Sequence, residues 1–139
     1  MKNIDTLKKL TLGKEDITEV IIEFEDEKYP LNMRPLTSGE LTKLQAIEKK
    51  PLIFKVEMQN GKRTGIQSND VDINTGEFAE AQSEAMYNAI ALSLSVDGET
   101  IKPDDVKGMK AGLPEIIFEK VIEISNLSSE DLTMIKSFQ

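Results

Sequence analysis

Residues 29–44 read YPLNMRPLTSGELTKL, and this stretch decides the fold of the chain. Its first half places Tyr29, Leu31 and Met33 at every second position, an alternation that predicts a β-strand. Pro35 biases the residue before it toward an extended backbone, so we expect the strand to hold up to that point. The stretch has no pattern typical of a catalytic centre, and we interpret it as a structural junction.

The second half of the stretch begins a helix. Thr37 and Glu40 have the spacing of a capping box, in which each side chain accepts a hydrogen bond from the exposed backbone N–H of the other residue. Apolar residues then follow at helical spacing up to Ile47. Pro51 is expected to end this helix, because proline has no N–H to donate to the preceding turn.

The residues before the junction predict a β-hairpin over residues 17–34. Apolar and polar residues alternate on both sides of Asp26-Glu27, which is the expected turn. Pro30 cannot donate a ladder hydrogen bond, so its strand is predicted to be an edge. A lone hairpin is only marginally stable in water, and its apolar face is therefore expected to pack against helices.

Residues 52–66 show a similar alternation and predict a second hairpin. Asn60-Gly61 would supply its turn, because both residue types tolerate a positive φ. Residues 67–76 are polar and are expected to form a loop.

The remainder of the chain predicts helices. From Glu77 to Ser95, apolar residues cover most of the helical circumference, which is typical of a helix buried on several sides. Further helices are expected near residues 103–110, from Leu113 to Asn126, and after the capping residues Ser128 and Asp131. These patterns predict one α+β domain over residues 1–139, with an N-terminal antiparallel β-hairpin region packed on a C-terminal helical bundle. Its parts are a candidate arm at 1–16, a strand-rich part with one helix at 17–66, and a helical part at 77–139.

The N-terminal residues 1–13 carry Ile4, Leu7 and Leu10 at spacings of three, so they have one apolar edge. Two interpretations stay open. The segment is either a strand or helical turn packed on the domain's own core, which is the commoner arrangement, or an arm that orders only against another subunit. The second interpretation would make the protein a homo-oligomer.

The composition excludes several kinds of chemistry. The chain has no histidine and no cysteine, so no side chain has an ordinary pKa near neutrality. Thiolate nucleophiles, Ser-His dyads and zinc sites with nitrogen or sulfur ligands are excluded. A net charge of −8 argues against binding to nucleic acid. No apolar run approaches the roughly 18 residues that a membrane span needs.

Acidic residues suggest two candidate sites. The run DVDINTG at residues 70–76 is similar to the start of a calcium loop, but its glycine stands seventh instead of sixth and the twelfth position is Ala81 instead of glutamate. We interpret it as a solvated loop, and we expect no metal, cofactor or catalytic residue. Glu115, Glu119 and Glu123 stack on one helix face, either as a solvated face or as an acidic surface for a basic partner.

Three segments of the chain resemble the tail assembly chaperones of long-tailed bacteriophages and prophages. The resemblance covers roughly residues 17–138, apart from residues 52–76, which look like an insertion. Its motifs are MRPLTSGEL at residues 33–41, AMYNAIALSL at residues 85–94 with the Asp-Gly turn after it, and the run from DVKGM at residues 105–109 through EII at residues 115–117 to ISNL at residues 124–127.

The resemblance implies a non-enzymatic protein in the cytoplasm of the bacterial host. It implies that the chain binds the long, apolar tape-measure protein, keeps it soluble and helps to recruit tail-tube subunits. As the contact surface we name the turn of Arg34, Pro35 and Leu36, expected to be exposed, together with the face of Glu115, Glu119 and Glu123. The alternatives are a tail completion or connector protein that stays in the virion and, from another class, a carboxylate-dependent hydrolase.

Overall fold

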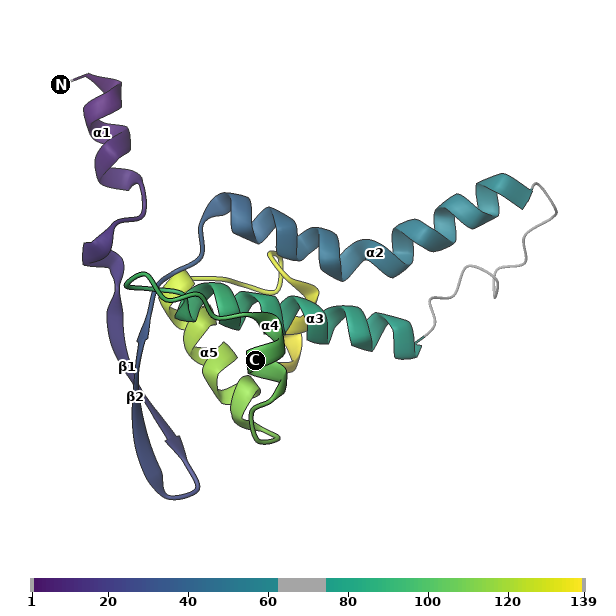
Figure 1. Ribbon diagram of the computed structural model, residues 1–139. Coiled ribbons are helices and arrows are strands. Elements are labelled where there is room, and N and C mark those ends of the chain that lie inside the picture. Colours follow the sequence, from purple (N-terminus) through teal and green to yellow (C-terminus); the bar gives the residue numbers. More distant parts are fainter. Residues whose placement is uncertain (1, 63–74, 139) are drawn as a thin grey trace.

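The protein is an α+β domain in which one β-hairpin packs beside a group of helices (Figure 1). The computed structural model describes residues 2–62 and 75–138. Within these described residues, two 3₁₀-helices, η1 and η3, accompany the α-helices. The elements are, in chain order, α1 (Asn3–Leu10), η1 (Lys14–Asp16), β1 (Thr18–Phe24), β2 (Glu27–Met33), α2 (Ser38–Lys62), α3 (Thr75–Leu94), α4 (Pro103–Lys107), α5 (Leu113–Ser125) and η3 (Thr133–Phe138).

The predicted first hairpin is confirmed, and its turn lies one residue earlier than expected. Strands β1 and β2 pair antiparallel from Thr18 opposite Met33 to Phe24 opposite Glu27. The loop is therefore Glu25-Asp26, and both residues have positive φ angles, 52° and 64°. Two consecutive positive φ angles define the type I′ turn, whose twist matches the twist of the flanking strands.

The predicted capping box is present at the start of α2. The backbone N–H of Glu40 donates to Thr37 Oγ1 at 3.2 Å, and the N–H of Thr37 donates to Glu40 Oε1 at 2.9 Å. The same carboxylate receives two hydrogen bonds from Arg34, at 2.8 Å and 2.7 Å. Glu40 thus caps α2 and also anchors the end of the hairpin to it.

The junction between β2 and α2 is tied to two other helices. Ser93 of α3 donates its hydroxyl to the carbonyl of Arg34 at 2.7 Å, and the N–H of Arg34 donates to the carbonyl of Ser93 at 3.0 Å. The N–H of Leu36 donates to the hydroxyl of Ser125 in α5 at 2.9 Å. The interpretation of residues 29–44 as a structural junction therefore agrees with the geometry.

The predicted second hairpin is wrong over residues 52–62, and its last four residues lie outside the described part of the chain. Helix α2 does not end at Pro51 but continues to Lys62. Figure 1 shows a bend midway along this helix, as expected when a proline removes one backbone donor without ending the helix. A short apolar run does not by itself distinguish strand from helix, and here the helical period applies.

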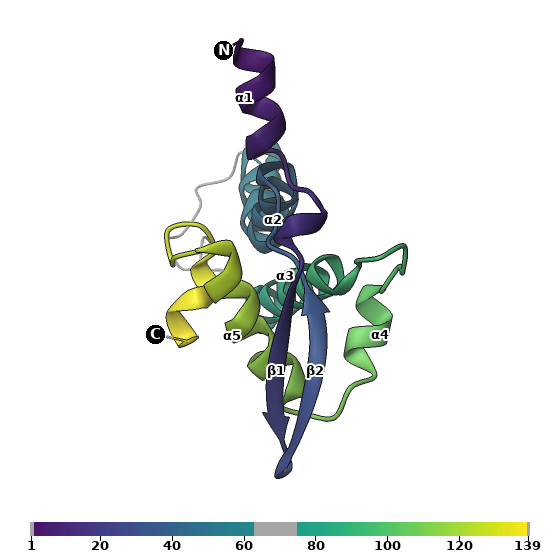
Figure 2. The ribbon, with the colours of Figure 1, turned by 90° about the vertical axis from the view of Figure 1, so that its left-hand side faces the viewer.

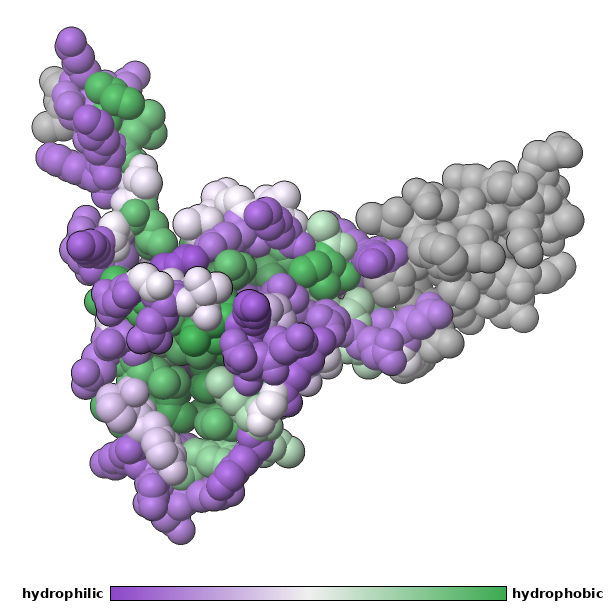
Figure 3. Space-filling view, viewed as in Figure 1, coloured by the Kyte–Doolittle hydropathy of each residue, from purple (hydrophilic) through white to green (hydrophobic). Residues whose placement is uncertain are grey.

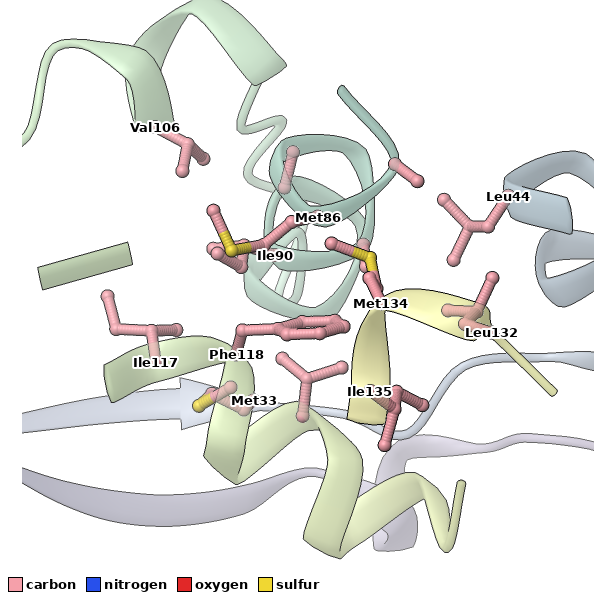
Figure 4. Packing of buried hydrophobic residues seen from close by; sticks show 14 of the residues in the cluster. Met33, Leu44, Met86, Ile90, Val106, Ile117, Phe118, Leu132, Met134 and Ile135 are labelled. Atoms are coloured by element: carbon pink, nitrogen blue, oxygen red, sulfur yellow. The ribbon is translucent and has the colours of Figure 1, made fainter. Parts of the chain in front are cut away.

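Helix α3 is the central element, as predicted. Its second half is buried, with Ala85, Ala89 and Ile90 all fully inaccessible, and it contacts α2, α4, α5 and β2. Figure 4 shows Phe118 of α5 between the α3 side chains and those of the C-terminal segment. The rings of Phe118 and Phe138 meet edge to face with centroids 5.3 Å apart.

A buried carboxylate fixes the C-terminal segment. Glu48 of α2 is 3% exposed and accepts the backbone N–H groups of Thr133 and Met134, each at 2.8 Å. It thereby caps η3, where the sequence predicted a last helix. The predicted cap precedes it, since Asp131 accepts the N–H of Ser128 at 2.8 Å.

The N-terminal segment does not pack on the core, so the first interpretation of residues 1–13 is wrong. Helix α1 projects beyond the open end of the hairpin, away from α3, α4 and α5 (Figures 1 and 2). None of its residues is buried. Its three apolar residues, Ile4, Leu7 and Leu10, are 55%, 56% and 77% exposed. Figure 3 shows hydrophobic surface exposed on the projecting helix.

Candidate functional site

The acidic stripe of Glu115, Glu119 and Glu123 lies on the exposed side of α5. The opposite side of this helix, with Ile117, Phe118 and Val121, is buried in the core. Pro114 near the first position and a left-handed Asn126 after the last turn fix the ends of the helix. The predicted face therefore exists, and burial of the other side holds it toward solvent.

A trough runs between β1 and α5 beside this stripe. The hollow has a volume of about 650 Å³. Figure 2 shows α5 beside β1 and α4 on the other side of the hairpin. The lining residues are Ile21, Ile22, Glu23 and Lys28 from the hairpin and Ile116, Glu119 and Lys120 from α5. We call this set the β1–α5 trough.

The trough combines an apolar floor with charged edges. Ile21 is 48% exposed, which is high for an isoleucine, and Ile116 is half-buried. Two neighbouring glutamates form ion pairs: the Lys28 ammonium lies 3.7 Å from the Glu23 carboxylate, and the Lys120 ammonium lies 3.8 Å from the Glu123 carboxylate. An apolar floor beside charged side chains can hold an amphipathic segment by burying its apolar side and pairing its charges.

Two members of the stripe have unpaired charges. Glu115 and Glu119 form no ion pair with any residue whose side chain is described, in the ranges 2–50 and 76–136 and at residue 138. Carboxylates four residues apart on one helix repel each other by a few tenths of a kcal/mol. A positively charged partner would relieve this repulsion.

A second, smaller hollow of about 230 Å³ lies on the other side of the stripe. It is lined by Glu119, Ile122 and Glu123 of α5 and by Ile135 and Phe138 of the C-terminal segment. Glu119 borders both hollows. Glu119 therefore lies between the two hollows.

The turn of Arg34, Pro35 and Leu36 is half-buried, which corrects the expectation that it is exposed. The side chain of Arg34 is 16% exposed and is paired with Glu40. Hydrogen bonds from Arg34 lower the pKa of the Glu40 carboxyl below its ordinary value, and the same contact raises the pKa of Arg34. The guanidinium of Arg34 is therefore not free to pair with a client, and α5 offers the better candidate contact surface. That the turn takes part in binding stays a prediction.

Sequence reasoning found the stripe but missed the floor of the trough. Ile21 lies within the hairpin predicted over residues 17–34, and nothing in the local pattern indicates that Ile21 and Ile116, 95 positions apart, line one hollow. The calcium-like run at residues 70–76 has its first five residues outside the described part of the chain.

Among the described residues, none of the helices combines the length and the apolar character that a membrane span requires.

Comparison with known proteins assigns no family: no family model, no curated protein and no solved structure matches the chain.

Proposed function

We propose that the protein is a non-enzymatic tail assembly chaperone of a long-tailed bacteriophage or prophage, and that it binds an apolar segment of the tape-measure protein. The observation that carries the proposal is the β1–α5 trough, whose isoleucine floor adjoins the unpaired carboxylate of Glu119, a member of the acidic stripe. The resemblance of the motifs at residues 33–41, 85–94 and 105–127 supplies the class of client.

The physical properties of the trough suit a helical or extended client with one apolar side and some basic residues. An apolar anchor over Ile21 and Ile116 would displace water from both side chains, and burial of one large aliphatic side chain is worth about 1.5–3 kcal/mol. Basic residues beside the anchor would pair with the stripe. The net charge of −8 would keep a complex with an aggregation-prone client soluble.

The test is co-purification of this chain with fragments of the tape-measure protein encoded beside it. Reversing two charges, Glu119→Lys with Glu123→Lys, should weaken binding at least roughly tenfold, as expected for losing two charge contacts at an interface. The matched control reverses the exposed Glu99 and Glu130, which lie outside the trough, and should leave binding unchanged. Equal binding by both double variants would exclude the stripe, and no binding by the natural chain to any fragment would reject the chaperone.

The virion-retained alternative has a separate readout. A chaperone leaves the assembly, so purified virions should lack this chain when they are analysed by mass spectrometry. Its presence there in stoichiometric amounts would indicate a tail completion or connector protein instead.

A further inference from the structure

Helix α1 has the properties of a surface that binds another molecule. Eight residues form a helix without burying any side chain, although isolated helices shorter than about 12–15 residues are marginal in water. Among the residues with described side chains, 2–50, 76–136 and 138, five large hydrophobic side chains are exposed, and three of them belong to α1. The other two, Ile21 and Tyr29, lie on the hairpin. An apolar contact from outside its own domain would stabilise α1.

The charge of α1 is opposite to that of the rest of the chain. Lys2 precedes the helix and Lys8 and Lys9 occupy its last turn, whereas Asp5 is its one acidic residue. The whole chain has 25 acidic and 17 basic residues. The arm is therefore a small cationic, amphipathic helix on an acidic protein.

We propose that α1 of one copy binds the β1–α5 trough of a second copy. Leu7 and Leu10 would cover the exposed Ile21 and the half-buried Ile116, and the lysines would pair with the stripe. The lengths agree, because eight helical residues and the eight-residue step from Glu115 to Glu123 each span about 12 Å. Helix α1 precedes β1, and both views show it extending away from α5, which forms one wall of its own trough; this favours a trough on another molecule (Figures 1 and 2).

The charges of the trough argue against its closing on a copy of itself. Two troughs face to face would bring the unpaired Glu119 of one copy against Glu119 of the other, and unpaired carboxylates in contact are unfavourable. The arm supplies the missing cations and the missing apolar surface together. Each copy then offers one arm and one trough, so two copies can exchange arms, or the contact can repeat along a chain of copies.

The inference does not depend on the proposed function, although both concern the same trough. Self-association is measured with this chain alone, whereas the chaperone is tested with its client. Either one can therefore fail while the other holds.

The experiment is sedimentation velocity of the full chain over a wide range of concentrations. The natural protein should associate reversibly. Leu7→Asp should weaken association at least roughly tenfold, the fold-change expected when the burial of one leucine is lost. Because no residue of α1 is buried in its own domain, this variant should keep its circular dichroism spectrum and melting temperature.

A charge swap tests whether the arm meets the trough. Lys8→Glu with Lys9→Glu should weaken association, Glu119→Lys with Glu123→Lys should do the same, and an equimolar mixture of the two double variants should restore it. The control Lys43→Glu with Lys49→Glu makes the same change in net charge on exposed α2 positions and should have no effect. A chain that stays monomeric throughout, association that is insensitive to Leu7→Asp, or a mixture that does not recover would each overturn the proposal.

Discussion

Arg34 and Glu40 show how two side chains can join the end of the hairpin to helix α2. Arg34 donates two hydrogen bonds to Glu40, and the carboxylate also caps the first turn of α2. The two side chains are 16% and 17% exposed, so water competes with the pair less than it does with a surface ion pair. Their contact should therefore contribute measurably to stability.

The pair predicts a loss of stability in acid. The pKa of Glu40 lies below its ordinary value of 4.5, chiefly because Arg34 donates hydrogen bonds to the carboxylate. The unfolded chain then takes up the proton first, so the contribution is complete above pH 4.5 and is lost as the pH falls through the lowered pKa. Glu40→Gln should cost about 1–3 kcal/mol at neutral pH, and this difference from the natural protein should shrink in acid.

Urea unfolding of both proteins at a series of pH values measures that difference. Glutamine keeps the capping-box geometry, so the variant removes the charge and leaves the helix cap in place. A difference in unfolding free energy that is the same at neutral and acidic pH would contradict the assignment.

Contacts between residues far apart in the sequence set the limit of what the sequence could predict here. The capping box joins residues three positions apart and was found. Glu48 caps residues 85 and 86 positions away, and Ser93 meets Arg34 across 59 positions. No local pattern indicates such pairings, because they depend on how whole elements pack.

Among the elements, the hairpin and the buried helices were predictable because their residue periods are distinct. The hairpin 17–34 and the helices starting near Glu77, Pro103 and Leu113 all appear close to the expected places. Helix α2 was cut short in the prediction because Pro51 and the alternation after it outweighed the helical period. The turn of the hairpin was misplaced by one residue because both Asp26 neighbours are acidic and neither is glycine.

The hairpin turn offers a way to stabilise the protein. Asp26 has a φ of 64°, a left-handed conformation that glycine adopts without steric cost. Asp26→Gly should raise the unfolding free energy by about 1 kcal/mol and the melting temperature by roughly 2–5 °C. The control Asp26→Ala should not stabilise, since alanine is strained in this conformation. Thermal denaturation followed by circular dichroism measures both, and stabilisation by alanine would contradict the turn type.

Taken as one molecule, the protein has a packed domain and an arm that lies outside it. The sequence left both interpretations of the arm open, because three apolar residues at helical spacing do not say what they pack against. The candidate trough has the same limit, since its two walls come from opposite ends of the chain. Of the candidate site, only the acidic stripe could be predicted from the sequence, because its residues all lie within one helix.

Deleting residues 2–12 should leave the domain intact. Gly13 is kept because its N–H donates to Asp16 at 2.7 Å at the entrance to β1. At a dilution where the natural chain is monomeric, the melting temperatures of the two proteins should agree within about 1 °C, as expected when no buried group is removed. A fall of several degrees would mean that α1 packs on its own domain.

The position of Tyr29 has a practical consequence for spectroscopy. The chain has no tryptophan and two tyrosines. Tyr29 lies opposite Ile22 on the hairpin and is 43% exposed, while Tyr87 sits below the ammonium group of Lys107 between α3 and α4. Replacing Tyr87 with phenylalanine would leave Tyr29 as the single tyrosine, next to the trough. Its tyrosine emission could then report occupancy of the trough without any attached dye.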